Sequence, residues 1–545
     1  MGVRLTSGTE KTSSSGNWWG SGTAWGVWIA LGTVAAHLAT GWRYGFDRDE
    51  LMALEDARHL AWGYVQYPPM TAFWGRVALE LFGTSLVGFR FFAAVAMAVA
   101  VVLTGLMAKE MGGGKWAQAT SALAAVPFCL GAGSLMQYMS FDYLGWVGVA
   151  YCMTRVASEE RQQVKEWNSD RVEESENRKA RMENGNGGER WWMGVGAGIG
   201  LGMLAKYTMG FLACGVVVGV LLTEMRRYLR SGWLWLGVLV SVVIFLPNLL
   251  WEWRHGFVSL EFLRFLHARD VRGGLTDWFL AGQLELTMLA FPLALAGIWF
   301  CFFTEEGRSF RILGWMYVVP LVLFLVMRGR DYYLAPGYPM LYAAGAVWAE
   351  RKWRVGESEN RKSKIEKRSR WVAKAIWVGL ILDVVAAGAV ALPIAPVNST
   401  WWRFATRVDS VFPEEIGWPE FVQAVAVVRD RLPAEERWRA GILAGNYGEV
   451  GALNLYGKKF GLPRAMSGVN SSWERGYGDP PEVVIVVGYP RAMLEGEFAS
   501  CVVGGRVWNR YGVMNEETIE DPEIFVCRGL KGRWEEFWRR VRKFA

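Results

Sequence analysis

Long, uninterrupted apolar blocks are the feature that most constrains how this 545-residue chain can fold. They include residues 95–106, 234–250, 313–327 and 371–392. A water-soluble domain rarely needs such runs, whereas a helix that crosses a bilayer needs about 20 predominantly apolar residues. Because 52% of the residues are hydrophobic and only 20% are charged, we predict an α-helical polytopic membrane protein. The same composition excludes a disordered chain, a coiled coil and a disulfide-rich secreted module.

The hydrophobicity pattern predicts about eleven membrane-spanning helices. We assign them to residues 24–42, 86–108, 116–134, 141–157, 191–205, 207–224, 232–251, 279–303, 312–328, 332–349 and 371–392. Basic residues concentrate between alternate blocks, above all in 350–370 and 225–231. Because basic loops face the cytoplasm, we expect a multi-pass plasma (inner) membrane protein with residues 43–85 and 252–278 outside. This orientation also explains the net charge of +7, so we expect the lipid bilayer and no nucleic acid as a partner.

The predicted domain organisation follows from this topology. A cytoplasmic tail (1–23) precedes a transmembrane domain (24–392), which contains a long outer loop (43–85) and two cytoplasmic linkers, 158–190 and 350–370. From residue 393 the character of the chain changes. Short β-rich runs at 441–444, 483–487 and 524–527, with a helical pattern at 420–432, predict a small extracytoplasmic α/β domain over 393–545.

Two cysteines, Cys501 and Cys527, lie in this predicted outer domain. They can pair if the domain is outside the cytoplasm, or stay free, because sequence spacing does not give the distance between them.

The outer loop 43–85 has two segments with helical periodicity. Residues 49–63 place apolar side chains on one side and charged ones on another, and residues 70–82 repeat the pattern after a Pro-Pro pair. We therefore expect two amphipathic helices lying on the membrane surface.

Three carboxylates lie at the start of the first of these helices, namely Asp47, Asp49 and Glu50. A carboxylate at the boundary between membrane and water can take a proton from a hydroxyl or bind a cation. The structural alternative is that Asp49 caps the helix and the other charges favour its N-terminus.

Further acids, bases and aromatic side chains collect on the predicted outer face. Cations beside a membrane interface suit a lipid-linked phosphate, and tyrosines suit the face of a sugar. Arg328 and Arg330 break the charge pattern of the loops, which indicates either function or snorkelling at a helix end. The other candidates are Arg43, His59, Tyr64, Gln66, Tyr67, Asp142, Lys206, Tyr207, Glu252, Arg254, His255, Arg264, Tyr332 and Tyr333.

Several of these residues fall in strings that resemble a known family. The strings are DELMALEDARHLAWGYVQYPPM and LFGTSLVGFR in the first outer loop, then GMLAKYTMGF, PNLLWEWRHGF, YYLAPGYPMLYAAGAVWAE and, in the tail, NYGEVGALNLYGKKFGLP. Together they resemble the bacterial branch of the glycosyltransferase family 39 type. This type belongs to the C-type membrane transferases, which include the protein O-mannosyltransferases and the lipid A aminoarabinose transferase. The resemblance covers most of the chain.

The resemblance implies an inverting transferase that moves a sugar from a polyprenyl-phosphate donor to a hydroxyl acceptor on the outer side of the membrane. It places the general base on Asp49, with Glu50 positioning the acceptor or a cation and Asp47 as a substitute base. For the donor phosphate we expect Lys206, Arg328 and Arg330. The remaining candidates for substrate binding are His59, Tyr64, Gln66, Asp142, Tyr207, His255, Tyr332 and Tyr333.

The chain departs from the family at Gln66, where many relatives have Asp or His. A metal or acid role at that position is therefore in doubt, and we expect no required metal or other cofactor, with a divalent cation as the alternative. The sugar, the prenyl length and the acceptor, which could be a lipid, a glycan or a protein, do not follow from the sequence.

Two other functions fit parts of the sequence. A transporter or flippase for lipid-linked sugars would use the same outer cations, but predicts charges deep within several spans and paired discontinuous helices. A non-catalytic assembly subunit would leave Asp49 and Glu50 unexplained.

Overall fold

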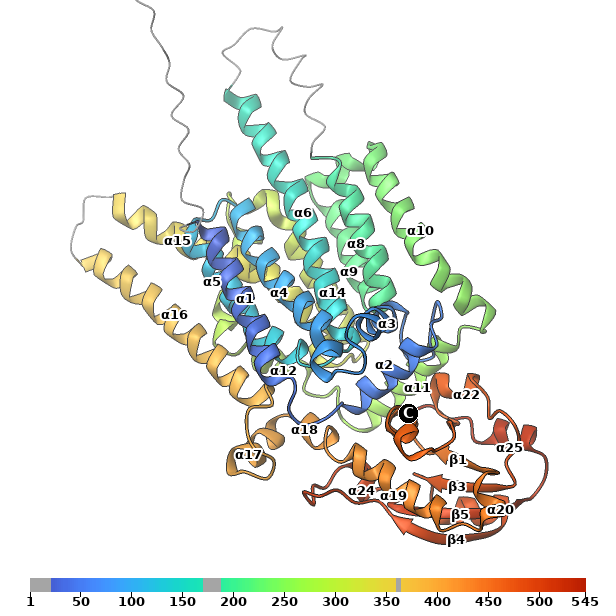
Figure 1. Cartoon of the computed structure of the whole chain (residues 1–545). Coiled ribbons are helices and arrows are strands. Elements are labelled where there is room, and N and C mark those ends of the chain that lie inside the picture. The colour runs from blue at the N-terminus through green and yellow to red at the C-terminus, as the bar shows by residue number, and fades with distance from the viewer. Residues whose placement is uncertain (1–20, 170–187, 359–363) are drawn as a thin grey trace, which may run out of the picture.

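The computed structural model describes residues 21–169, 188–358 and 364–545. It consists of a helical bundle with a smaller sheet-containing domain at one end (Figure 1). Parts of the predicted tail 1–23 and of the linkers 158–190 and 350–370 lie outside the described residues. The predicted domain boundaries stay a prediction.

A helix occupies each of the eleven predicted spans. In chain order they are α1 (Gly22–Thr40), α4 (Leu86–Glu110), α5 (Lys115–Ala132), α6 (Tyr138–Ser169), α8 (Trp191–Ala205), α9 (Met209–Leu222), α10 (Gly232–Arg254), α12 (Phe279–Thr287) continued through η5 (Met288–Ala290) into α13 (Phe291–Phe303), α14 (Arg311–Val326), α15 (Tyr338–Ser358) and α16 (Lys364–Ala391). Among the described residues, six helices are both long and apolar enough to cross a membrane, or seven if α9 and the bent η4 (Glu224–Arg230) count as one span. The prediction of a polytopic helical membrane protein is confirmed.

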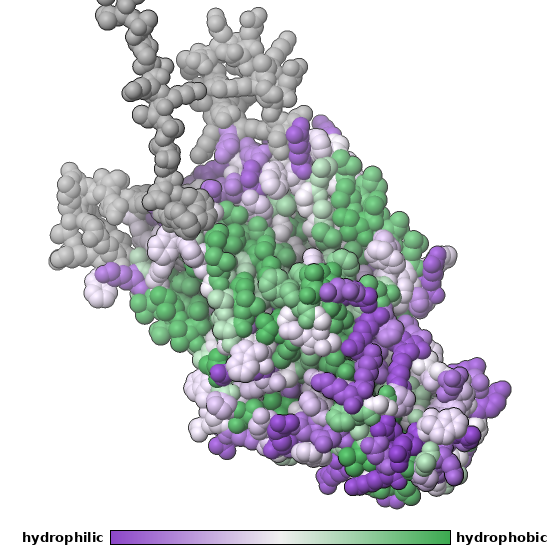
Figure 2. Space-filling view, viewed as in Figure 1, coloured by the Kyte–Doolittle hydropathy of each residue, from purple (hydrophilic) through white to green (hydrophobic). Residues whose placement is uncertain are grey.

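The outer surface of the bundle is apolar. Figure 2 shows a hydrophobic zone over the helices and a largely hydrophilic surface over the C-terminal domain. Along α10 only 17% of the apolar window is buried, and along α16 only 11%, so these two helices present most of their surface to the surroundings. Such faces are stable in contact with lipid.

The tenth helix begins later than predicted. Residues 332–337 belong to a short 3-10 helix, η7 (Asp331–Gly337), and α15 begins only at Tyr338. Pro336 lies within η7. Because proline lacks an amide hydrogen and disfavours the α conformation in the residue before it, a continuous α-helix through this segment is unfavourable.

The C-terminal domain contains a five-stranded mixed sheet in the order β2-β1-β3-β5-β4. The strands are β1 (Ala440–Ala444), β2 (Ala465–Ser467), β3 (Val483–Val487), β4 (Phe498–Arg506) and β5 (Glu523–Leu530). Strands β2, β1 and β3 are parallel, whereas β5 is antiparallel to both β3 and β4. The three predicted strands are therefore present, while the edge strands β2 and β4 were missed.

Helices cover both faces of this sheet. One face packs against α19 (Trp418–Asp430) and α21 (Tyr447–Tyr456), and the other against α23 (Arg491–Glu497) and α25 (Trp534–Arg540). The remaining short helices of the domain are α17 (Thr400–Val408), α18 (Val411–Glu414), α20 (Ala434–Arg437), η8 (Gly457–Phe460), α22 (Asn470–Glu474) and α24 (Glu516–Ile519). Cys501 and Cys527 lie opposite each other on β4 and β5 and form a disulfide.

The outer loop contains two helices, α2 (Arg48–Arg58) and α3 (Met70–Phe82), but the prediction that both lie on the membrane surface is wrong for α2. The apolar core of the C-terminal domain continues into α2 through Leu51 and Leu54, so α2 is enclosed between this domain and the bundle. A Cβ atom at Gly451 of α21 would lie 2.6 Å from the carbonyl oxygen of Leu51, which shows how closely the two helices approach.

Helix α2 also ends five residues earlier than the pattern suggested. After Arg58 the chain turns back, and the amide of Ala61 donates to the hydroxyl of the buried Tyr64.

Candidate active site

A cavity of about 390 Å³ lies where the bundle, the outer loop, α11 (Val258–Arg272) and the C-terminal domain meet. Its polar lining comes from residues far apart in sequence, namely Asp49, Gln66, Tyr67, Tyr138, Lys206, Tyr207, Thr208, His267, Arg269, Asp270, Arg328, Arg330, Tyr332, Tyr333, Tyr447 and Asn470. Nine of the candidates from the sequence belong to this lining: Asp49, Gln66, Tyr67, Lys206, Tyr207, Arg328, Arg330, Tyr332 and Tyr333. The cavity is therefore the candidate active site.

One wall of the cavity is apolar. Phe262, Leu263 and Leu266 of α11 face it together with Phe324 and Met327 at the end of α14. A polar end and an apolar wall within one cavity suit an amphiphilic ligand.

Asp49 is on the first turn of α2 and points into the cavity. Burial raises the pKa of its carboxyl group above the usual range, while Arg48, a hydrogen bond from Tyr447 and the charge of Arg330 act in the opposite direction. A raised pKa makes an aspartate a better proton acceptor than an exposed one, provided that it is ionised at the working pH.

The side chains of Asp47 and Glu50, unlike that of Asp49, stabilise the start of α2. Asp47 is the N-cap of α2 and accepts a hydrogen bond from the amide of Asp49 at 2.8 Å, while Glu50 accepts from the amide of Asp47 at 3.0 Å. The cap is therefore Asp47, and the alternative prediction that Asp49 caps this helix is wrong. Neither side chain lines the cavity, so the catalytic role predicted for Asp47 and Glu50 receives no support from their position.

Glu50 is also part of a buried ionic cluster. Arg90 of α4 donates to Glu50 at 2.6 Å and to Glu415 of the C-terminal domain at 3.0 Å, and the amide of Met136 donates to Glu50 at 2.9 Å. All three charged side chains are almost completely buried. The cluster thus joins the outer loop, the bundle and the C-terminal domain at Glu50, the residue after Asp49.

Lys206 lies in the break between α8 and α9, surrounded by three tyrosine rings. Its ammonium group is 4.2 Å from the ring centre of Tyr333, 4.8 Å from that of Tyr138 and 5.0 Å from that of Tyr332. Asp142 is its acidic neighbour. An ammonium group held by aromatic faces keeps donors available for an anion.

The two predicted arginines differ in their surroundings. Arg330 makes two hydrogen bonds of 2.6 Å to Asp270, which fix its guanidinium at the cavity wall. Arg328 pairs with Asp277 at 2.6 Å, and both side chains are about half exposed. Arg330 is therefore the better placed of the two for a buried phosphate.

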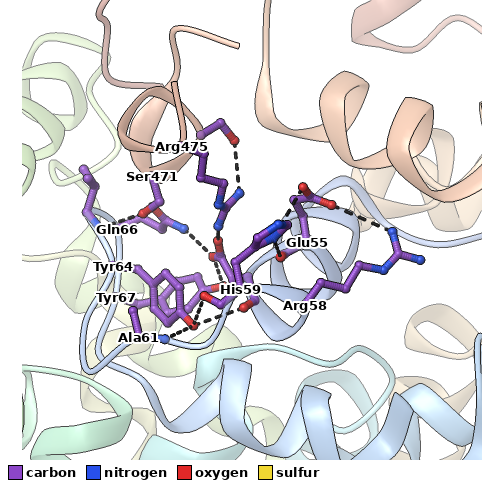
Figure 3. Close-up of polar contacts among 12 residues, drawn as sticks. Glu55, Arg58, His59, Ala61, Tyr64, Gln66, Tyr67, Ser471 and Arg475 are labelled. Atoms are coloured by element: carbon purple, nitrogen blue, oxygen red, sulfur yellow. Dashed lines mark hydrogen bonds and ion pairs between the residues drawn. The ribbon is translucent and has the colours of Figure 1, made fainter. Parts of the chain in front are cut away.

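Gln66 belongs to the contact between the outer loop and the C-terminal domain. Its amide nitrogen donates to Asp56 at 2.7 Å, and its oxygen accepts from Ser471 at 3.0 Å. Asp56 also accepts from Tyr67 at 2.5 Å and pairs with Arg475. Figure 3 shows Gln66 of the outer loop close to Ser471 and Arg475 of the C-terminal domain.

The other predicted substrate-binding residues divide into two groups. Tyr207 lines the cavity and donates to Glu252 at 3.0 Å, and Tyr332 and Tyr333 line it as part of the tyrosine cluster. Four residues lie outside the lining: His59, Tyr64, Asp142 and His255. His59 caps the end of α2, and the hydroxyl of the buried Tyr64 donates to a backbone carbonyl. Asp142 accepts a hydrogen bond from Thr208, and His255 is stacked on Trp251. Contact between these four residues and a substrate receives no support from their positions.

Seven polar residues of the lining were not among the candidates from the sequence: Tyr138, Thr208, His267, Arg269, Asp270, Tyr447 and Asn470. For α11 a signal was present, because Phe262, Leu266, Arg269 and Asp270 recur at helical spacing within loop 252–278. Tyr447 lies in the string NYGEVGALNLYGKKFGLP, but the sequence does not show that it is close to Asp49, which is almost 400 residues away.

Within the residues that the structure describes, no group of three or more His, Cys, Asp or Glu side chains is arranged to hold a metal ion.

Comparison with known proteins gives one family match. The family described as dolichyl-phosphate-mannose-protein mannosyltransferase matches residues 66–169 and 182–251, which include Lys206 but begin after Asp49. No curated protein sequence matches the chain.

Two crystal structures of ArnT from Cupriavidus metallidurans have the same fold. The form bound to undecaprenyl phosphate superimposes with a TM-score of 0.56 at 15% identity, and the apo form with 0.53 at 17%. Each alignment covers 92% of this chain and 98% of ArnT. The predicted resemblance to family 39-like C-type membrane transferases is thereby confirmed, as is the fold class.

Proposed function

We propose that this chain, which has the fold of the C-type membrane transferases, transfers a sugar from a polyprenyl-phosphate donor to a hydroxyl acceptor. One observation carries the proposal: a single cavity presents a carboxylate, Asp49, two cations, Lys206 and Arg330, and an apolar wall. A base, an anion site and an apolar surface are what this reaction requires.

The apolar wall and the cations indicate where the prenyl chain and the phosphate of the donor bind. The prenyl chain lies along α11 and the end of α14, and the phosphate lies near Lys206 and Arg330. The binding of undecaprenyl phosphate by ArnT, a protein of the same fold, supports this assignment. Arg269, which also lines the cavity, adds positive charge on the same side.

The proposed reaction is one displacement with inversion. The acceptor oxygen attacks the anomeric carbon and forms a new carbon–oxygen bond, while the bond from that carbon to the phosphate oxygen breaks. Asp49 takes the proton of the acceptor hydroxyl, and the electron pair leaves with the polyprenyl phosphate. Lys206 and Arg330 stabilise the negative charge that develops on the phosphate.

The tyrosines and Gln66 supply the contacts to the sugar. Tyr207, Tyr332 and Tyr333 offer hydroxyls and ring faces at the cavity wall, and Gln66 offers its amide. Glu50 acts through Arg90 and the helix cap, which hold α2 in place. We propose that no resident metal takes part, because the displacement is complete with these side chains.

Charge removal at Lys206 tests the donor site. With radiolabelled sugars on polyprenyl phosphates and membranes containing the full chain, Lys206→Met should raise the KM for donor about ten- to a hundred-fold, since a hydrogen bond to a charged group contributes about 1.5–3 kcal/mol. Lys458→Met, at an exposed position of the C-terminal domain, should behave as wild type. A chelator should leave the wild-type rate unchanged.

Other outcomes have defined meanings. Equal KM values for the two lysine variants would contradict the phosphate role of Lys206, and loss of activity with the chelator would establish a metal. If the wild type consumes no donor but moves labelled lipid across reconstituted vesicles, the chain is a transporter instead.

We also propose that the C-terminal domain is outside the cytoplasm, at the inner membrane. The disulfide between Cys501 and Cys527 supports this side, because disulfides persist in oxidising compartments. On intact cells, an impermeant reductant followed by an impermeant maleimide should label the chain. A Cys501→Ser, Cys527→Ser double variant should lose this label. Labelling that appears only after the membrane is permeabilised would place the domain inside.

A further inference from the structure

We infer that Tyr447, which the C-terminal domain supplies, is a positioning residue for Asp49, so that this domain completes the active site. The inference rests on the proposed function and extends it to a residue outside the helical bundle. It gives the C-terminal domain a defined task next to the reacting groups.

The contacts of Tyr447 carry the inference. It is the first residue of α21 and lines the cavity together with Asp49, and hydrogen bonding from its hydroxyl lowers the pKa of the Asp49 carboxyl group. The guanidinium of Arg48 lies over its ring, 5.0 Å from the ring centre. The same Arg48 donates to Glu516 of the C-terminal domain at 2.7 Å. Arg48 and Tyr447 both favour the ionised Asp49 carboxylate, and both are held by this domain.

Tyr447 is itself rigidly placed. Asn446 caps α21 by accepting from the amide of Glu449 at 2.8 Å, and Glu449 accepts from the amide of Asn446 at 3.1 Å. A Cβ atom at Gly448 would lie 3.0 Å from the Cβ atom of Arg48, so the start of α21 packs directly on the start of α2. A capping box and this close contact leave the tyrosine little freedom to move away from Asp49.

The hydrogen bond has a predictable effect on the acid–base behaviour of Asp49. Charged and titratable groups that face it come from α2 and its N-cap (Arg48, Glu50 and Asp47), the N-cap of η7 (Arg330), α6 (Tyr138) and α21 (Tyr447). Of these, Arg48, Tyr447 and Arg330 favour the ionised carboxylate. Removing the Tyr447 hydroxyl therefore raises the pKa of Asp49, and a reaction that needs ionised Asp49 then begins only at higher pH.

The test replaces one hydroxyl in the full-length protein. Tyr447→Phe should move the acidic limb of the pH profile of kcat/KM to higher pH by about one pH unit, because a hydrogen bond to a carboxylate changes its pKa by this order. Tyr511→Phe removes an exposed hydroxyl from the same domain and should leave the profile unchanged. A purely structural role for Tyr447 would lower the rate equally at every pH.

A second readout needs no turnover. Carbodiimide modifies protonated carboxyl groups, so the pH at which half of Asp49 reacts, measured by mass spectrometry, should rise in Tyr447→Phe and stay unchanged in Tyr511→Phe. If Tyr447→Phe keeps the wild-type midpoint in this assay, the inference is overturned even if sugar transfer is observed. A raised midpoint in a protein that transfers no sugar would support the role of Tyr447 and would contradict only the proposed function.

Discussion

Replacing Asp49 by asparagine should lower sugar transfer by about 10²–10⁴-fold, the range that general-base catalysis contributes. The change keeps the size of the side chain and removes its ability to take a proton. Arg48 and Tyr447, which favour the ionised carboxylate, stay in place, and the Tyr447 hydroxyl can still donate to the amide oxygen. The variant should therefore insert and fold like the wild type, and the loss should appear in kcat rather than in the KM for donor.

Transfer of labelled sugar from polyprenyl phosphate, measured in membranes with matched protein amounts, checks this result. Asp479→Asn, which changes an exposed aspartate of the C-terminal domain, is the matched control and should be fully active. Asp47→Asn separates the two candidate bases. If Asp49→Asn keeps its activity while Asp47→Asn loses it, the base is Asp47, and the helix cap then has a second role.

The bundle was predictable because its signal is local. Each span can be recognised from its own run of about 20 apolar residues, and the basic loops indicate which ends of the spans face the cytoplasm. Errors occurred where a local pattern had two interpretations. The amphipathic pattern of residues 49–58 fits a helix on a membrane surface, but it also fits α2, whose Leu51 and Leu54 pack into the core of the C-terminal domain.

The candidate site was predictable only in part, for the same reason. Lys206, Arg330 and Tyr333 stood out as polar residues at the ends of apolar spans, where charge is costly without function. Arg90 did not stand out, because at the beginning of a span it is typical of an interfacial arginine. Its contacts with Glu50 and Glu415 join positions 40 and 325 residues away, and a sequence pattern does not report such distances.

The cluster around Arg90 predicts the largest effect on stability. Arg90→Leu leaves Glu50 and Glu415 buried without their shared cation, which should cost about 3–5 kcal/mol of folding free energy. Burial already raises the pKa of Glu415 to about 7, and Arg90 opposes this effect, so its loss should protonate Glu415 near neutral pH. Protonation limits the penalty but leaves polar atoms without partners.

Thermal unfolding of the purified protein in detergent tests this prediction, with the Tm as the readout. Arg76→Leu is the matched control, because Arg76 pairs with Glu80 on an exposed face of α3 and its loss should cost less than about 1 kcal/mol. Adding Glu415→Gln to Arg90→Leu should recover part of the lost Tm, since one uncompensated charge is removed. Equal Tm values for the two arginine variants would contradict the role of this cluster in joining the C-terminal domain to the bundle.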